Sequence, residues 1–152
     1  MPDESDAGEY NRDFWVWGEE ETEPRMLHTM IRVKDFQESL RFYCDTLGMK
    51  VLDKFDVEVR RSTGLFIGYG NYRASALLEL VQKWDESDYT HGTAYGHVAI
   101  GLPDLPAMTR RIEAAGYEVT DQPAVLIKGG PMVAFVKDPD GYAVELIQIQ
   151  RG

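Results

Sequence analysis

A repeated pattern of lone ionisable residues constrains the fold of this chain most strongly. His28, Glu79, His97 and Glu145 each stand alone in an apolar, strand-like run, in the order His, Glu, His, Glu. The first pair is 51 residues apart and the second pair 48. Burying a lone ionisable side chain in a strand is costly unless it is paired or coordinated. We therefore predict two copies of one module, whose four ionisable side chains bind a single metal ion.

Each copy shows the same order of elements: a strand, a helix, a further strand and a hairpin. Asp35, with Glu38 as a capping box, and Asp104 mark the helix starts, and Gly48 and Gly116 mark their ends. This order predicts an α+β fold of two βαβββ modules rather than a doubly wound parallel sheet. The expected ranges are strands 27–33, 50–52, 64–69 and 76–81 with a helix over 36–47, then strands 97–102, 117–120, 132–136 and 142–147 with a helix over 105–115.

The first 25 residues differ in composition from the rest, with nine carboxylates against two arginines. We expect residues 1–25 to form an acidic N-terminal extension and residues 26–152 to form the folded domain, with module one over about 26–90 and module two over about 91–149. The extension also carries an aromatic cluster, which we expect to dock on the body or on a partner subunit. A disordered extension is the alternative. The cluster consists of Tyr10, Phe14, Trp15 and Trp17.

Composition excludes several classes of function. A formal net charge of −10 disfavours binding to nucleic acid or to anionic membrane surfaces. Cys44 is the only cysteine, so no internal disulfide can form. No apolar run approaches the roughly 20 residues that span a bilayer, and the acidic N-terminus lacks the apolar core of a signal peptide. We expect a soluble, cytoplasmic protein.

Strand periodicity places each of the four ionisable residues on the same face as small or apolar neighbours. Two imidazoles and two carboxylates are typical ligands of nickel, cobalt, manganese or zinc in a site with open positions. A core histidine bonded to a carbonyl, or a strand glutamate at a wet edge, is the alternative for any one of them alone. His91 falls outside the repeat, and we expect it on the surface.

Several motifs coincide with these residues: His28-Thr29-Met30-Ile31-Arg32-Val33, Phe42-Tyr43 with Leu47-Gly48-Met49, Glu79-Leu80, Gly92-Thr93-Ala94-Tyr95-Gly96-His97, and Asp138-Pro139-Asp140-Gly141-Tyr142 with Glu145-Leu146. With these motifs, the chain resembles glyoxalase I (lactoylglutathione lyase) of the vicinal oxygen chelate superfamily over about residues 26–148. The resemblance implies a glyoxalase-like fold of paired βαβββ modules.

The resemblance also implies an activity. His28, Glu79, His97 and Glu145 would bind the metal, Glu145 would be the catalytic base, and Glu79 would lie on the opposite side of the substrate. The short segment between Glu79 and His97 resembles the bacterial form that prefers nickel or cobalt, while zinc or manganese stay possible. The implied reaction converts the methylglyoxal–glutathione hemithioacetal to S-D-lactoylglutathione through a cis-enediolate. The implied assembly is a homodimer with the site at the subunit interface.

The resemblance also implies substrate-binding residues on strands and loops. Arg32 would bind the γ-glutamyl carboxylate of glutathione, and Lys83 stands where the family usually has an asparagine. Lys83 follows Glu79 by four residues, as Arg32 follows His28, which is roughly 13 Å along each strand. Two such cations could clamp a carboxylate, or the change could mark a different thiol. The predicted substrate-binding residues are Arg32, Lys83, Thr93, Lys128 and Gly129.

Other functions are compatible with part of these observations. A related superfamily enzyme could act on another thiol adduct or could be an epimerase. Iron dioxygenases use two histidines and one carboxylate, so a second carboxylate here counts against them. A metal-free binding module is a third alternative, although such proteins lose ligands that this chain retains.

Overall fold

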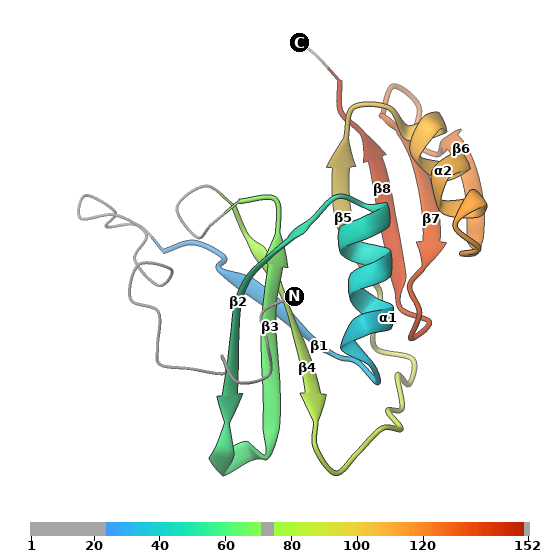
Figure 1. Cartoon of the computed structure of the whole chain (residues 1–152). Coiled ribbons are helices and arrows are strands. Elements are labelled where there is room, and N and C mark those ends of the chain that lie inside the picture. Colours follow the sequence, from blue (N-terminus) through green and yellow to red (C-terminus); the bar gives the residue numbers. More distant parts are fainter. Residues whose placement is uncertain (1–23, 71–74, 151–152) are drawn as a thin grey trace. The chain divides into compact units, whose positions relative to one another are not determined.

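The computed structural model of the chain describes residues 24–70 and 75–150 (Figure 1). The chain divides into two compact units between Tyr89 and Thr90. The predicted acidic extension, with its aromatic cluster, lies outside the described residues apart from residues 24 and 25. Within the described ranges, no helix is long and apolar enough to cross a membrane.

The first unit contains one four-stranded sheet in the order β1-β4-β3-β2. β1 pairs with β4 in parallel, and the other neighbours are antiparallel. β2 is longer than predicted and contains a register shift between Val51 and Asp53. The elements are β1 (His28–Arg32), α1 (Phe36–Leu40), the π-helix η2 (Arg41–Thr46), β2 (Lys50–Val57), the 3₁₀ turn η3 (Glu58–Arg60), β3 (Ser62–Gly68) and β4 (Leu77–Lys83).

The second unit repeats this topology. Its sheet has the order β5-β8-β7-β6, with β5 and β8 parallel and the other neighbours antiparallel. Its elements are β5 (His97–Leu102), α2 (Leu105–Ala114), β6 (Val119–Val125), β7 (Met132–Lys137) and β8 (Ala143–Gln148). The prediction of an α+β fold with two βαβββ modules is therefore confirmed.

The helix starts follow the predicted caps, with one difference. Asp35 accepts a hydrogen bond from the Gln37 N–H, and Asp104 accepts one from the Ala107 N–H. Glu38 does not complete the expected capping box. Its carboxylate instead accepts a hydrogen bond from Arg41 Nη1 at 3.1 Å, because one helical turn brings these two side chains together.

The second half of the first helix also departs from prediction. An α-helix was expected over 36–47, but the chain widens into a π-helix at Arg41, where the Thr46 hydroxyl donates to the Arg41 carbonyl at 3.0 Å. Phe42 and Tyr43, both fully buried, pack edge to face with ring centroids 4.8 Å apart. The wider helical turn brings neighbouring aromatic residues into the core, which a helical stripe does not predict.

A glutamine at the same place in each unit ties the helix to the last strand. Gln82 lies three residues after Glu79 and accepts from the N–H of Phe36, the first residue of α1, at 3.4 Å. Gln148 lies three residues after Glu145 and accepts from the N–H of Leu105, the first residue of α2, at 2.8 Å. Strand side chains alternate faces, so these glutamines point to the helix side and the glutamates point to the other face. Within the described residues, each helix therefore packs on the face of its sheet opposite to the glutamate.

Candidate active site

Each unit brings one histidine and one glutamate together on the glutamate-bearing face. Glu79 is the Cα partner of Met30, two residues after His28, and Glu145 is the partner of Ala99, two residues after His97. The register of the parallel strands is therefore the same in both copies. It places His28 Nε2 3.0 Å from Glu79 Oε2, and His97 Nε2 3.8 Å from Glu145 Oε1.

A phenylalanine on the third strand of each unit supports this pair. Phe66 is the Cα partner of Glu79, and Phe135 is the partner of Glu145. The Phe66 ring meets the His28 imidazole edge to face at 5.1 Å, and the Phe135 ring meets that of His97 at 5.3 Å. The sequence repeat identified the histidines and glutamates, but only the cross-strand register reveals the two phenylalanines. Each unit thus presents the same His–Phe–Glu arrangement.

Both glutamates are mostly shielded from water, with side chains 16% and 19% exposed for Glu79 and Glu145. Burial raises the pKa of Glu79, and the neighbouring His28 partly opposes that shift. A shielded carboxylate of this kind gains from a nearby cation.

Within neither unit does a third histidine, cysteine, aspartate or glutamate join the pair, as far as residues 24–70 and 75–150 show. Each unit therefore offers one imidazole nitrogen and one carboxylate as candidate metal ligands. These donors fit nickel, cobalt, zinc or manganese, all of which accept imidazole and carboxylate together. Two such half-sets would make the four-residue set predicted from the sequence, and their joint role stays a prediction.

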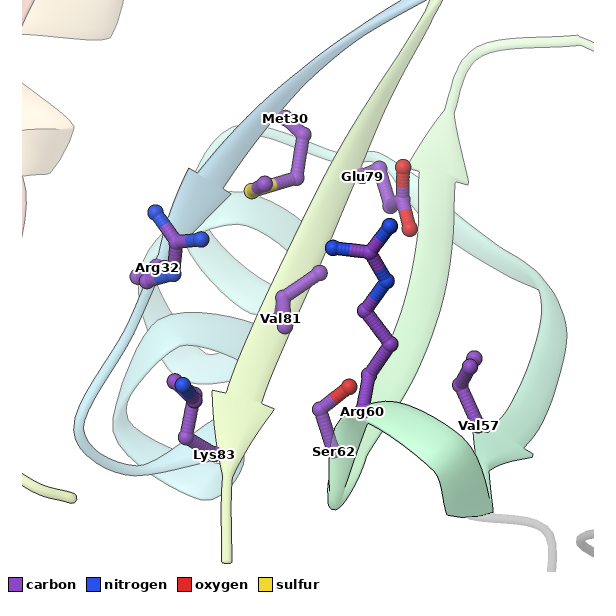
Figure 2. Close-up of a pocket in the computed structure, with 8 residues that line it drawn as sticks. All are labelled: Met30, Arg32, Val57, Arg60, Ser62, Glu79, Val81 and Lys83. Carbon is purple, nitrogen blue, oxygen red and sulfur yellow. The ribbon is translucent and has the colours of Figure 1, made fainter.

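A pocket of about 290 Å³ lies on the same face of the first unit and includes Glu79 (Figure 2). Two predicted substrate-binding residues, Arg32 and Lys83, line it together with Arg60, which the sequence analysis did not identify. Lys83 also pairs with Glu86, with Nζ 3.2 Å from Oε1. Three cations and one carboxylate thus share the pocket, in a chain whose net charge is −10. The lining residues are Met30, Arg32, Val57, Arg60, Ser62, Glu79, Val81 and Lys83.

The other predicted substrate-binding residues belong to the second unit and are exposed. Thr93 lies in the turn before β5, and Lys128 and Gly129 lie in the turn between β6 and β7. The positive φ of Gly129, 80°, suits glycine at this turn. No ligand contact tests these three residues, so their roles stay predictions.

His91 is not the simple surface residue expected. It is half-buried, and its ring stacks on that of Tyr142, with centroids 4.1 Å apart and planes 6° from parallel. Tyr142 follows the Asp138–Gly141 turn, so the stack joins the segment before β5 to the start of β8. Non-local packing of this kind has no local signal in the sequence.

Comparison with known proteins identifies the family of the chain. The family model described as "Glyoxalase/Bleomycin resistance protein/Dioxygenase superfamily" matches residues 25–146. The chain belongs to this superfamily. A probable lactoylglutathione lyase of Vibrio cholerae is 46% identical over 124 residues, which is 82% of this chain and 90% of that protein. One from Synechocystis is 43% identical and covers 81% of this chain and 94% of its own length.

Solved structures point the same way. Glyoxalase I of Leishmania major, described as trypanothione-dependent, superposes with a TM-score of 0.73 at 41% identity over 83% of this chain and 87% of that chain. Maize glyoxalase I gives 0.77 at 35% identity over 84% of this chain and 45% of that chain. These relatives confirm the resemblance to glyoxalase I and the prediction of a lyase.

Proposed function

We propose that this chain is a metal-dependent glyoxalase I. It would isomerise the hemithioacetal of methylglyoxal and glutathione to S-D-lactoylglutathione through a cis-enediolate, and so remove methylglyoxal. The observation that carries the proposal is the His–Phe–Glu arrangement, repeated in the same register in both units. The names of the relatives support the same reaction.

His28, Glu79, His97 and Glu145 would together hold one divalent ion. When bound, that ion would act as a Lewis acid on the two neighbouring oxygens of the substrate. We propose nickel or cobalt ahead of zinc or manganese, because the segment between Glu79 and His97 is as short as in the bacterial nickel- and cobalt-preferring form. The four ligands would come from both subunits of a homodimer. The enzyme would work in the cytoplasm.

Glu145 would carry the proton during the reaction. It would take the proton from C1 of the hemithioacetal and return it to C2, so that the reaction needs no external acid, base or redox partner. The side chain is only 19% exposed and lies on the strand face of Ala143 and Ile147. These neighbours keep bulk water away from a base that must hold the proton between two steps. Glu79 would lie on the opposite side of the substrate.

The cationic pocket would hold the thiol. Arg32 and Lys83 would bind the γ-glutamyl carboxylate, with Thr93, Lys128 and Gly129 contacting the substrate from loops. Lys83 replaces the asparagine usual at this place, and this observation also favours an alternative, the same chemistry on another anionic thiol. An epimerase is a second alternative with the same metal chemistry. The metal-free binding module is disfavoured because both His–Glu pairs are intact.

The decisive experiment compares Glu145→Gln with the wild-type protein after reloading with nickel. We expect kcat for lactoyl thioester formation from methylglyoxal and glutathione to fall by about 10²- to 10⁴-fold, the usual contribution of a general base. Elemental analysis should still find bound nickel, held more weakly. Glu118→Gln, which removes the same charge from an exposed position in the same unit, should leave kcat unchanged. Near wild-type turnover by the Glu145 variant would show that this residue is not the base.

A further inference from the structure

Arg60 is placed in the pocket by η3, the short turn before β3. Figure 2 shows its side chain rising over the face of the sheet, with the guanidinium pointing toward Glu79. No ion pair joins Arg60 to another residue in the described part of the chain. A guanidinium carries five N–H donors in a fixed fork that matches a carboxylate. Arg60 is thus available to an anionic ligand.

The turn that carries Arg60 is firmly held. The next residue, Arg61, has a φ of 47°, an uncommon conformation for a side chain of this size. Its N–H donates to the Glu58 carbonyl at 3.0 Å, and its carbonyl accepts from the Trp84 N–H at 3.0 Å. Its side chain forms two hydrogen bonds with Asp85, from Nε at 2.5 Å and from Nη2 at 3.1 Å.

Further contacts fix the same turn to the end of β4. The Arg61 guanidinium lies over the Trp84 ring, 5.4 Å from its centroid, and Trp84 Nε1 donates to the Thr63 hydroxyl at 2.9 Å. Thr63 in turn donates to Asp56 at 2.6 Å. Arg61 therefore serves as a structural residue, and the adjacent Arg60 extends from a supported backbone. A binding residue on such a support loses little freedom when it meets its ligand.

The second unit shows that the fold does not require the cations of Arg32 and Lys83. Four residues after the histidine, the first unit has Arg32 and the second has Gly101. Four residues after the glutamate, the first has Lys83 and the second has Ile149. Ile149 packs close to Gly101, where an added Cβ would meet it at 3.3 Å. One βαβββ copy thus carries cations where its twin carries an apolar contact, so the cations serve the ligand rather than the scaffold.

The turn itself also has a counterpart. Arg61 closes η3 five residues before Phe66, and Gly130 closes the Ile127–Gly130 turn five residues before Phe135, each by an N–H bond to the residue three positions back. In the second unit this turn carries Lys128. Both copies therefore present a cation on the turn that precedes the third strand.

We propose that Arg60 binds the glycine carboxylate of the thiol, so that this pocket selects thiols with two carboxylates. The inference rests on the proposed function, in which Arg32 and Lys83 hold the γ-glutamyl carboxylate. β4 separates Arg32, on β1, from the start of β3, which corresponds to about two strand spacings or roughly 10 Å. A carboxylate held by Arg32 and Lys83 therefore leaves Arg60 free to bind a second one.

The test measures binding of S-methylglutathione, which cannot react, to nickel-loaded wild-type protein and to Arg60→Gln by titration calorimetry. We expect the variant to bind about tenfold more weakly, equivalent to about 1.4 kcal/mol. Arg60→Lys should recover part of that loss, because the charge returns without the fork. Arg110→Gln removes the same charge from an exposed position on α2 and should change Kd less than about twofold.

A second ligand identifies the carboxylate. The S-methylglutathione monoester blocked at the glycine carboxylate should bind wild-type protein about tenfold more weakly, and Arg60→Gln should cause no further loss. An equal loss for acid and ester would overturn the inference, because Arg60 would then act through its general field. An unchanged Kd of Arg60→Gln for S-methylglutathione would also overturn the inference, and the proposed function would still stand if the wild type turns over the hemithioacetal. If the wild type shows neither turnover nor binding, the proposed function fails together with the inference.

Discussion

Replacing Phe66 with leucine tests whether the phenylalanine orients His28 and Glu79, the pair proposed to bind the metal. Phe66 is 1% exposed, and among the described residues its ring contacts those of His28 at 5.1 Å and Phe55 at 5.2 Å. Leucine keeps most of the apolar volume but removes both ring contacts. The change therefore separates orientation of the imidazole from simple filling of the core.

The structure sets the expected size of the effect. An aromatic pair contributes about 0.5–1.5 kcal/mol beyond its buried area, so losing two pairs lowers the free energy of unfolding by about 1–3 kcal/mol. The contact to His28 alone corresponds to about a 2- to 10-fold increase in the Kd for the metal. Phe135 makes the matching contact with His97 and is half-buried. Phe135→Leu should therefore lower the free energy of unfolding by about 0.5–1.5 kcal/mol and weaken metal binding to a similar extent.

Urea unfolding of the metal-free variants measures the stability, and competition with a chelator of known affinity measures nickel binding. Val136→Ala, on the helix-facing side of β7, is the control for core damage that does not touch the pair. It should lower stability and leave the Kd for nickel unchanged. If Phe66→Leu lowers stability but binds nickel like the wild type, the phenylalanine only fills the core and our reasoning about orientation is wrong.

Two further predictions concern single side chains. Lys83→Gln should raise KM for the glutathione adduct about 3- to 10-fold and change kcat less than about twofold in steady-state assays, since the contact is remote from the reacting carbons; an unchanged KM would remove Lys83 from the pocket's function. Burial, aided by Asp45, raises the pKa of Cys44 to about 11. Its alkylation rate should therefore climb about tenfold per pH unit from pH 8 to pH 10, because only the thiolate reacts; a plateau near pH 9 would contradict this.

The elements that the sequence predicted correctly are those with local signals. Asp35 and Asp104 begin helices because a side-chain oxygen can satisfy a free N–H at a helix start in any tertiary context. The strand from His97 to Leu102 has the predicted bounds because its apolar run ends at a proline–aspartate turn. The pairing of His28 with Glu79 followed from repeat spacing, which reports on two matched strands even though their contact is non-local.

The elements that were missed depend on contacts distant in sequence. The π-helix at Arg41–Thr46 satisfies the packing of Phe42 and Tyr43, which no helical periodicity encodes. Arg60 stands in a charged stretch typical of an exposed turn. It lines the pocket from a turn that is held by long-range contacts, among them the bond from Arg61 to Asp85, 24 residues later. Register and side-chain networks of this range cannot be deduced from spacing alone.

The two copies of the module provide an internal comparison that a single-copy fold lacks. Positions that are alike in both copies form the shared scaffold and the His–Phe–Glu arrangement: a histidine on the first strand, a phenylalanine on the third, and a glutamate followed three residues later by a helix-binding glutamine on the fourth. Positions that differ between the copies are not needed for the shared scaffold. Arg32 and Lys83, which line the pocket, differ in this way from Gly101 and Ile149 in the second unit. Divergence between the two duplicated modules therefore accounts for a cationic pocket in one unit of an acidic chain.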